Sequence, residues 1–161
     1  MTEAVLTKHA ETAGQSSGLT QAAAALAYAG ALPLISGAVV AWARPDLAGP
    51  LLRFMTIYGG VLLVFFGGVR WGIAVMRRGG PGFGHLLGAV LPALLGLPVI
   101  LTDNVPTGLG ALVVLLPLLL VSDLRATRAG SGAPAWYLGV RVPLTVMMEA
   151  ALIAGLVLAL T

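Results

Sequence analysis

Cysteine is absent from the 161-residue chain, and charged side chains are scarce, at 9% of the residues. Without cysteine the chain cannot form disulfides, attach haem covalently or bind a metal through thiolates. An average soluble domain carries about 25% charged residues, so this chain has too few charges to cover a water-exposed surface. These two deficits exclude an ordinary soluble enzyme, a disordered chain and a nucleic-acid-binding protein.

Apolar side chains make up 58% of the residues and occur in long runs. About 20 apolar residues are enough for a helix to cross a bilayer. We therefore predict an all-α fold, a polytopic integral membrane bundle of about five transmembrane helices. A single transmembrane domain over 21–161 follows a disordered polar tail over 1–20, and its predicted spans are 21–43, 51–76, 84–101, 107–122 and 138–160.

Lysine and arginine are distributed unequally between the two sides of these spans. Two of them, Arg44 and Arg53, lie on one side, and the other side carries six, which are Lys8, Arg77, Arg78, Arg125, Arg128 and Arg141. Basic residues accumulate on the cytoplasmic side of membrane proteins, so we predict a cytoplasmic N-terminus and a C-terminus outside. The net charge of +3 then serves orientation and contact with lipid headgroups rather than nucleic-acid binding.

Two charged residues lie inside predicted spans and define a hypothetical intramembrane binding site. Arg70 and Glu149 have similar predicted depths, and Thr145 lies one turn from Glu149 on the same helix face. Intramembrane charges usually pair or line a cavity. Three interpretations stay open: a structural ion pair, a polar site for a proton, ion or headgroup, and two separately solvated charges, with Arg70 reaching the cytoplasmic surface.

A second pair of charges lies at the predicted cytoplasmic interface. Asp123 ends the fourth span and Arg141 begins the fifth, so a salt bridge between them would hold the intervening loop in place. The alternative is that Asp123, together with Arg125 and Arg128, contacts lipid phosphates.

Glycine is abundant, at 22 residues. Gly68-x-x-x-Gly72 and Gly84-x-x-x-Gly88 have the spacing of close helix contacts in membranes. Small residues occupy more than one face of the second span, which predicts a central position for that helix. The two prolines of the third span are expected to kink it.

Chemistry-bearing clusters are missing from the sequence. His85 has no second histidine or carboxylate at helical spacing, so we expect no metal site. No Ser–His–acid set, phosphate-binding loop or pair of catalytic carboxylates can be assembled. We therefore predict no enzymatic activity, no catalytic residues and no cofactor.

Three segments are similar to those of a known family. They are Tyr58–Gly72, Gly88–Pro92 and Ala133–Thr145, and the motif residues within them are Tyr58, Gly67, Gly68, Trp71, Gly72, Pro134, Trp136, Tyr137, Arg141 and Pro143. The chain resembles the domain-of-unknown-function family 3429, the transmembrane protein 69 group. That resemblance implies an integral membrane protein of about five helices and no established activity or catalytic residues.

Two functions remain open from the sequence. The first is a non-enzymatic scaffold or assembly partner for other membrane proteins in the bacterial inner (plasma) membrane. Its partners would be the lipid bilayer and other membrane proteins, or a second copy bound through glycine-rich helix faces. The second is a small transporter or proton-coupled channel that uses Arg70 and Glu149 together with the proline-broken third helix.

Overall fold

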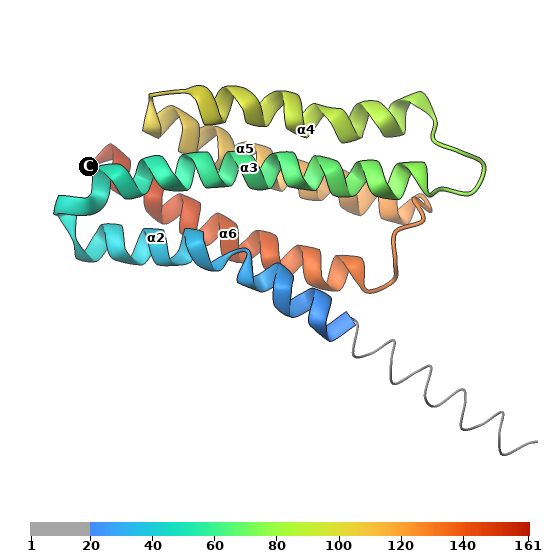
Figure 1. The fold of residues 1–161 in the computed structure, drawn as a ribbon, viewed down its shortest axis with the longest axis horizontal. Helices are drawn as coiled ribbons and strands as arrows, with labels where there is room; N and C mark the ends of the chain where they lie inside the picture. Colours follow the sequence, from blue (N-terminus) through green and yellow to red (C-terminus); the bar gives the residue numbers. More distant parts are fainter. Residues whose placement is uncertain (1–19) are drawn as a thin grey trace, which may run out of the picture.

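The chain is an all-helical bundle over residues 20–161, which are the residues that this computed structural model describes. The predicted tail over 1–20 lies outside this range except for its last residue. The elements are a helical stretch over 20–29, α2 (Leu32–Ala43), the 3₁₀ turn η1 (Pro45–Leu47), α3 (Ala48–Val75), α4 (Phe83–Leu101), α5 (Val105–Arg128) and α6 (Tyr137–Leu160) (Figure 1).

Five helical stretches in this range are long and apolar enough to cross a membrane, which confirms the predicted fold class. They are Thr20–Ala43, Pro45–Val75, Phe83–Leu101, Val105–Arg128 and Tyr137–Leu160. Leu, Ile, Val and Ala dominate these stretches, and the backbone hydrogen bonds of a helix are all internal, as lipid requires.

The first span is broken in the middle. The helix stops at the turn over Gly30 and Ala31, and α2 starts again with Pro33 in its first turn, where a missing N–H costs nothing. The carbonyl of Gly30 accepts a hydrogen bond from the hydroxyl of Tyr58 on α3, at 2.9 Å. A side chain of the neighbouring helix thus satisfies a carbonyl at the break.

The fourth span is longer than predicted. We expected it to end at residue 122, but α5 continues through Arg128. Its C-cap follows at Ala129, and Gly130 then turns the chain with a positive φ of 77°, a conformation that suits glycine. Asp123 is therefore inside a helix and not at its end.

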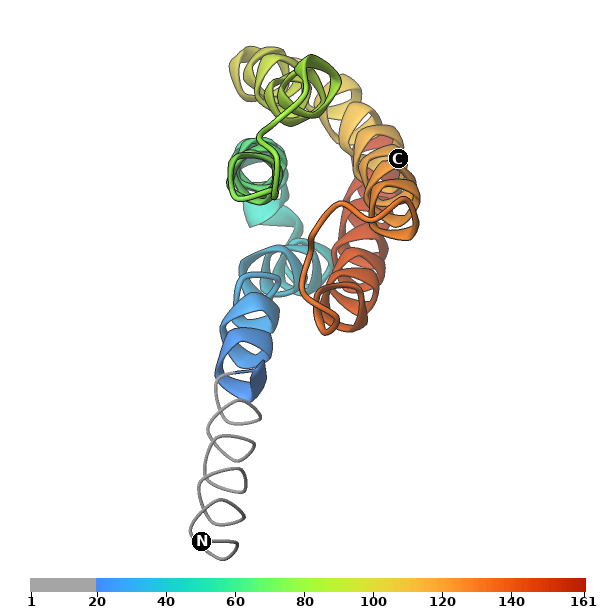
Figure 2. The same cartoon turned by 90° about the vertical axis from the view of Figure 1, so that its right-hand side faces the viewer.

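Helix α3 packs against every other long helix of the described bundle, as its glycine-rich faces predicted. Seen along the helices, α4, α5, α6 and α2 follow one another in an arc that α3 closes (Figure 2). The core between them is apolar. Its fully buried side chains include Leu63 of α3, Leu112 and Leu116 of α5, and Met148 and Leu152 of α6.

Glycines bring the backbones of α3 and α4 into close contact. A Cβ atom added at Gly67 would lie 2.7 Å from the carbonyl oxygen of Ala89, and one added at Gly96 would lie 3.0 Å from the carbonyl oxygen of Gly60. Small residues of this kind let membrane helices pack backbone to backbone. The glycine seam, defined here as Gly60, Gly67, Ala89 and Gly96, joins two helices that are consecutive in the chain.

The two predicted G-x-x-x-G contacts do not form within the chain. Added Cβ atoms at Gly68, Gly72 and Gly84 meet nothing within 4 Å, and one at Gly88 meets only the Arg70 guanidinium. The reason is helical phase, because Gly67 turns toward α4 while Gly68 and Gly72 lie on another face of α3. Helix α4 also continues through both of its prolines instead of breaking there.

The loops group as the span count predicted. The connections over 76–82 and 129–136 lie at the same end of the bundle as residue 20, and η1 and the turn over 102–104 lie at the other end with the C-terminus (Figure 1). The choice of which end faces the cytoplasm rests on the charge count and stays a prediction.

We expect a reporter fused after Thr161 to be active only if it functions outside the cytoplasm. A reporter fused into the 76–82 loop should show the opposite behaviour, because that loop lies at the other end of the bundle. Activity of a cytoplasm-only reporter at the C-terminus would overturn the predicted orientation.

Gly67→Ala should lower the free energy of unfolding by about 1–3 kcal/mol, the usual cost of overpacking. The new methyl group would press on the Ala89 carbonyl oxygen, which belongs to backbone and cannot rotate away. Gly68→Ala is the matched control, since its Cβ meets open space. Melting curves in detergent measure both, and equal stability of the two variants would contradict the role given to the seam.

Candidate functional site

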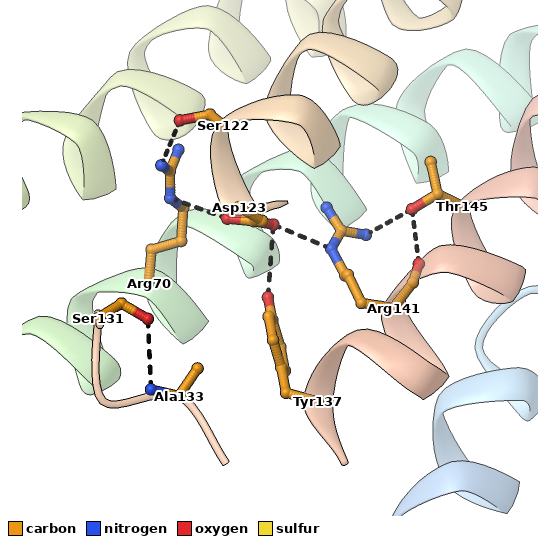
Figure 3. Close-up of polar contacts among 8 residues, drawn as sticks. All are labelled: Arg70, Ser122, Asp123, Ser131, Ala133, Tyr137, Arg141 and Thr145. Atoms are coloured by element: carbon orange, nitrogen blue, oxygen red, sulfur yellow. Dashed lines mark hydrogen bonds and ion pairs between the residues drawn. The ribbon is translucent and has the colours of Figure 1, made fainter. Parts of the chain in front are cut away.

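Asp123 lies between two arginines, Arg70 and Arg141 (Figure 3). Its Oδ1 lies 3.1 Å from Arg70 Nε, and its Oδ2 lies 3.2 Å from Arg141 Nε. The side chains of Asp123 and Arg141 are only 4% and 3% exposed, and that of Arg70 is 16% exposed. We call these three residues the Arg–Asp–Arg cluster.

The cluster joins three helices through one carboxylate. Arg70 comes from the last turns of α3, Asp123 from α5 and Arg141 from the first turns of α6. Arg70 precedes the end of α3 by five residues, or roughly 8 Å at 1.5 Å per residue. The cluster therefore lies near the headgroup region at that end and well away from the bilayer midplane.

Neighbouring side chains fix the orientation of both guanidinium groups. Arg70 Nη2 donates to Ser122 Oγ at 2.6 Å, and Arg141 Nη1 donates to Thr145 Oγ1 at 3.0 Å. Arg141 also lies over the ring of Phe66, with its Cζ 3.5 Å from the ring centre, a favourable cation–π arrangement.

Tyr137 closes the cluster on the side of α6, where its hydroxyl donates a long hydrogen bond of 3.4 Å to Asp123 Oδ2. One buried donor of the cluster is unused, because Arg141 Nη2 has no hydrogen-bond partner among the described residues. With two arginines and one carboxylate, the cluster carries an excess positive charge in a buried place.

The proposed pairing of Arg70 with Glu149 is wrong. The ionic partner of Arg70 is Asp123, and Glu149 Oε1 is buried without a hydrogen-bond partner in the described structure. Glu149 follows the start of α6 by twelve residues, or roughly 18 Å, so it lies much deeper than Arg70. Thr145, expected in the same site, bonds instead to Arg141 and to the backbone of its own helix.

The salt bridge between Asp123 and Arg141 considered from the sequence is present, but it is buried between helices and does not lie exposed at a helix end. Both side chains are buried, because α5 runs past Asp123. The shared use of Asp123 by Arg70 was missed for the same reason. Gly130 is the first glycine or proline after Pro117, and that signal could have placed Asp123 about two turns inside the helix.

A cavity of about 160 Å³ adjoins the cluster between α3, α4, α5 and the loop that leads into α6. Its polar lining residues are Arg70, His85, Asp123, Thr127, Ser131 and Tyr137. Glu149 and Thr145 do not line it. At the edge, Arg77 Nη1 lies 2.6 Å from His85 Nε2. Within residues 20–161 no group of three or more His, Asp or Glu side chains could hold a metal ion.

Several motif residues have direct structural roles. Tyr58 bonds to the break in the first span, Gly67 belongs to the glycine seam, and Tyr137 and Arg141 belong to the polar cluster or its edge. Others face outward: Gly68, Trp71, Pro134, Trp136 and Pro143 are exposed, and Gly72 is half-buried.

Comparisons with known proteins agree with the motif resemblance. The family model described as "Protein of unknown function (DUF3429)" matches residues 19–157. The chain is similar to Transmembrane protein 69 of Xenopus tropicalis, with 29% identity over 139 residues that cover 82% of this chain and 52% of the relative. It thus spans about half the length of that curated relative. No solved structure matches. Together with the apolar helices, these matches identify an integral membrane protein.

Asp123→Ala should cost roughly 3–5 kcal/mol of stability, because it leaves the buried guanidinium group of Arg141 and the partly buried one of Arg70 without their carboxylate. Glu149→Gln is the control, since no arginine depends on Glu149. Heating each variant in detergent and measuring the loss of monodisperse protein gives the stability of both variants. If Glu149→Gln proves as damaging as Asp123→Ala, the ion pairing described above is incorrect.

Proposed function

We propose that this chain, which belongs to the DUF3429 family, is a non-enzymatic scaffold or assembly partner for other membrane proteins. The observation that supports this function is the presence of glycines on the outward face of α3. No described helix of this chain packs closely enough against them to require glycine. Gly68 and Gly72 lie on that face in open space.

The outward face of α3 is otherwise large and apolar. Phe54, Val61, Phe65 and Val75 share it at helical spacing, and each is at least 43% exposed. Lipid chains pack against such side chains, but they gain nothing from glycine, which lowers helix stability by roughly 0.5–1 kcal/mol relative to alanine. Glycine becomes useful when another helix approaches closely. We therefore expect a transmembrane helix of a partner protein to lie against Gly68 and Gly72.

The non-enzymatic part of the proposal rests on how the polar side chains are used. Arg70, Asp123, Arg141 and Thr145 bond mainly to one another, which holds the helices together. The transporter alternative requires Arg70 and Glu149 in one site, and Glu149 is absent from the lining of the cavity beside Arg70. No observation favours that alternative.

The bacterial inner membrane is the location we propose. Helical bundles are the usual architecture of inner-membrane proteins, whereas the outer membrane holds β-barrels. The excess of arginine at one end of the bundle fits the asymmetry of positive charge found across inner membranes.

A photo-crosslinking residue in place of Val61 tests the scaffold function in native membranes. We expect a discrete adduct with a different membrane protein, identified by mass spectrometry, that decreases at least about fivefold with Gly68→Leu and Gly72→Leu. The added Cβ atoms meet nothing within 4 Å among the described residues of the chain, and the leucine side chains are expected to block the approach of another helix to α3. Gly110→Leu is the matched control, because it also meets open space but lies on α5.

Two results contradict the proposal. An adduct formed only with a second copy of the chain indicates self-association. Adducts that persist in Gly68→Leu and Gly72→Leu show that the outward face of α3 meets neighbouring proteins only by chance. Adducts that never contain protein show that this face contacts lipid alone.

A further inference from the structure

The two ends of the bundle differ in how their arginines are paired with carboxylates. At the end with η1, Arg44 pairs with Asp46 at 2.8 Å, and Arg53 lies 3.6 Å from Asp103. Arg53 also donates to the backbone carbonyls of Thr102 and Ile100. Each arginine at this end has its own carboxylate, and the charges balance.

The opposite end carries a large positive excess. Its arginines within residues 20–161 are Arg70, Arg77, Arg78, Arg125, Arg128 and Arg141, and the only carboxylate among them is Asp123. Asp123 is already shared by two of them. The field at this end therefore attracts anions, and it is strongest where charges are removed from water.

The cavity beside the Arg–Asp–Arg cluster opens into this positive field. Helices α4 and α5 are joined closely at the 102–104 turn and diverge toward the end that holds the cluster (Figure 1). The cavity of about 160 Å³ lies in this divergence, with Arg70, Ile73 and Ala74 of α3 as one wall. Arg70 uses Nε for Asp123 and Nη2 for Ser122, and its Nη1 has no partner in the described structure.

The remaining lining provides further donors and little bulk. Gly84 and Gly88 of α4 leave the wall without side chains, and an added Cβ at Gly88 would lie 3.8 Å from Arg70 Nη2. The hydroxyl of Ser131 accepts a hydrogen bond from the Ala133 N–H, so its own proton is free to donate. His85 and Arg77 stand together at the edge.

We infer that this cavity binds a phosphate group, with Arg70 as the partly buried cationic anchor and His85, paired with Arg77, at its entrance. Arginine recognises phosphate oxygens through its planar fork of donors. The depth of the cluster, roughly 8 Å inside the end of α3, matches the headgroup region. Basic pockets between transmembrane helices at this depth bind anionic headgroups, so the phosphate is that of an anionic phospholipid entering between α4 and α5.

Thermal melting of the purified chain in a neutral detergent tests this site. Phosphatidylglycerol added to the micelles is expected to raise the Tm by a few degrees, because a ligand that binds only the folded state stabilises it. Phosphatidylcholine, added equally, controls for general lipid effects. Glycerol 1-phosphate and inorganic phosphate at constant ionic strength test a soluble source of the same group.

Gly88→Val fills the cavity while all charges are kept, and Gly139→Val is its matched control in open space on α6. We expect Gly88→Val to weaken the apparent affinity for phosphatidylglycerol at least about tenfold and Gly139→Val to leave it unchanged. His85→Gln and Arg77→Gln, which do not touch Asp123, give a second measurement if Gly88→Val fails to fold. Each should weaken binding, and Arg77→Gln, which removes a charge, should also reduce its salt dependence.

A phosphatidylglycerol effect that both Gly88→Val and Gly139→Val retain overturns the site, as does equal stabilisation by phosphatidylcholine. Failure of phosphatidylglycerol and both soluble phosphates to shift the Tm overturns it as well. A shift with glycerol 1-phosphate but not with phosphatidylglycerol supports the phosphate site and assigns its ligand to the aqueous phase. The proposed scaffold function is unaffected by any of these outcomes, since it depends on the other side of α3.

Discussion

One buried carboxylate holds the bundle together at its positively charged end. Asp123 of α5 is the shared ionic partner of Arg70 on α3 and Arg141 on α6. In lipid, an apolar side chain gains little by leaving a neighbouring acyl chain for a neighbouring helix, so ionic and hydrogen-bonded contacts largely determine which helices stay together. Replacing a buried carboxylate of this kind leaves charges that nothing else can neutralise, and the geometry of the adjoining cavity depends on it as well.

Glycines on the two faces of α3 have different roles. Gly67 faces inward and lets α4 approach backbone to backbone, while Gly68, one residue later, faces outward into open space. The same helix thus contributes to the fold, to the polar cluster through Arg70 and to the outward face that we propose as the surface for a partner.

The sequence predicted the helix count, the central position of α3 and the grouping of the loops, because length, hydropathy and glycine phase are local properties of the chain. It did not predict that Arg70 pairs with Asp123 and not with Glu149. That choice depends on how far α5 continues beyond its apolar run and on which helices are neighbours in space. The end of α5 could have been predicted from Gly130. Which helices lie side by side could not, since a single sequence does not specify the order of helices around a bundle.

The order of elements along the chain has a consequence for biogenesis. The glycine seam joins α3 to α4, which follow each other directly, so this hairpin can form as soon as both helices have entered the membrane. Arg70, in contrast, pairs only after Asp123 has been made, and Asp123 receives its second arginine only when α6, which follows α5, is inserted. A chain interrupted before α5 has been inserted therefore keeps an arginine without its carboxylate in the hairpin of α3 and α4.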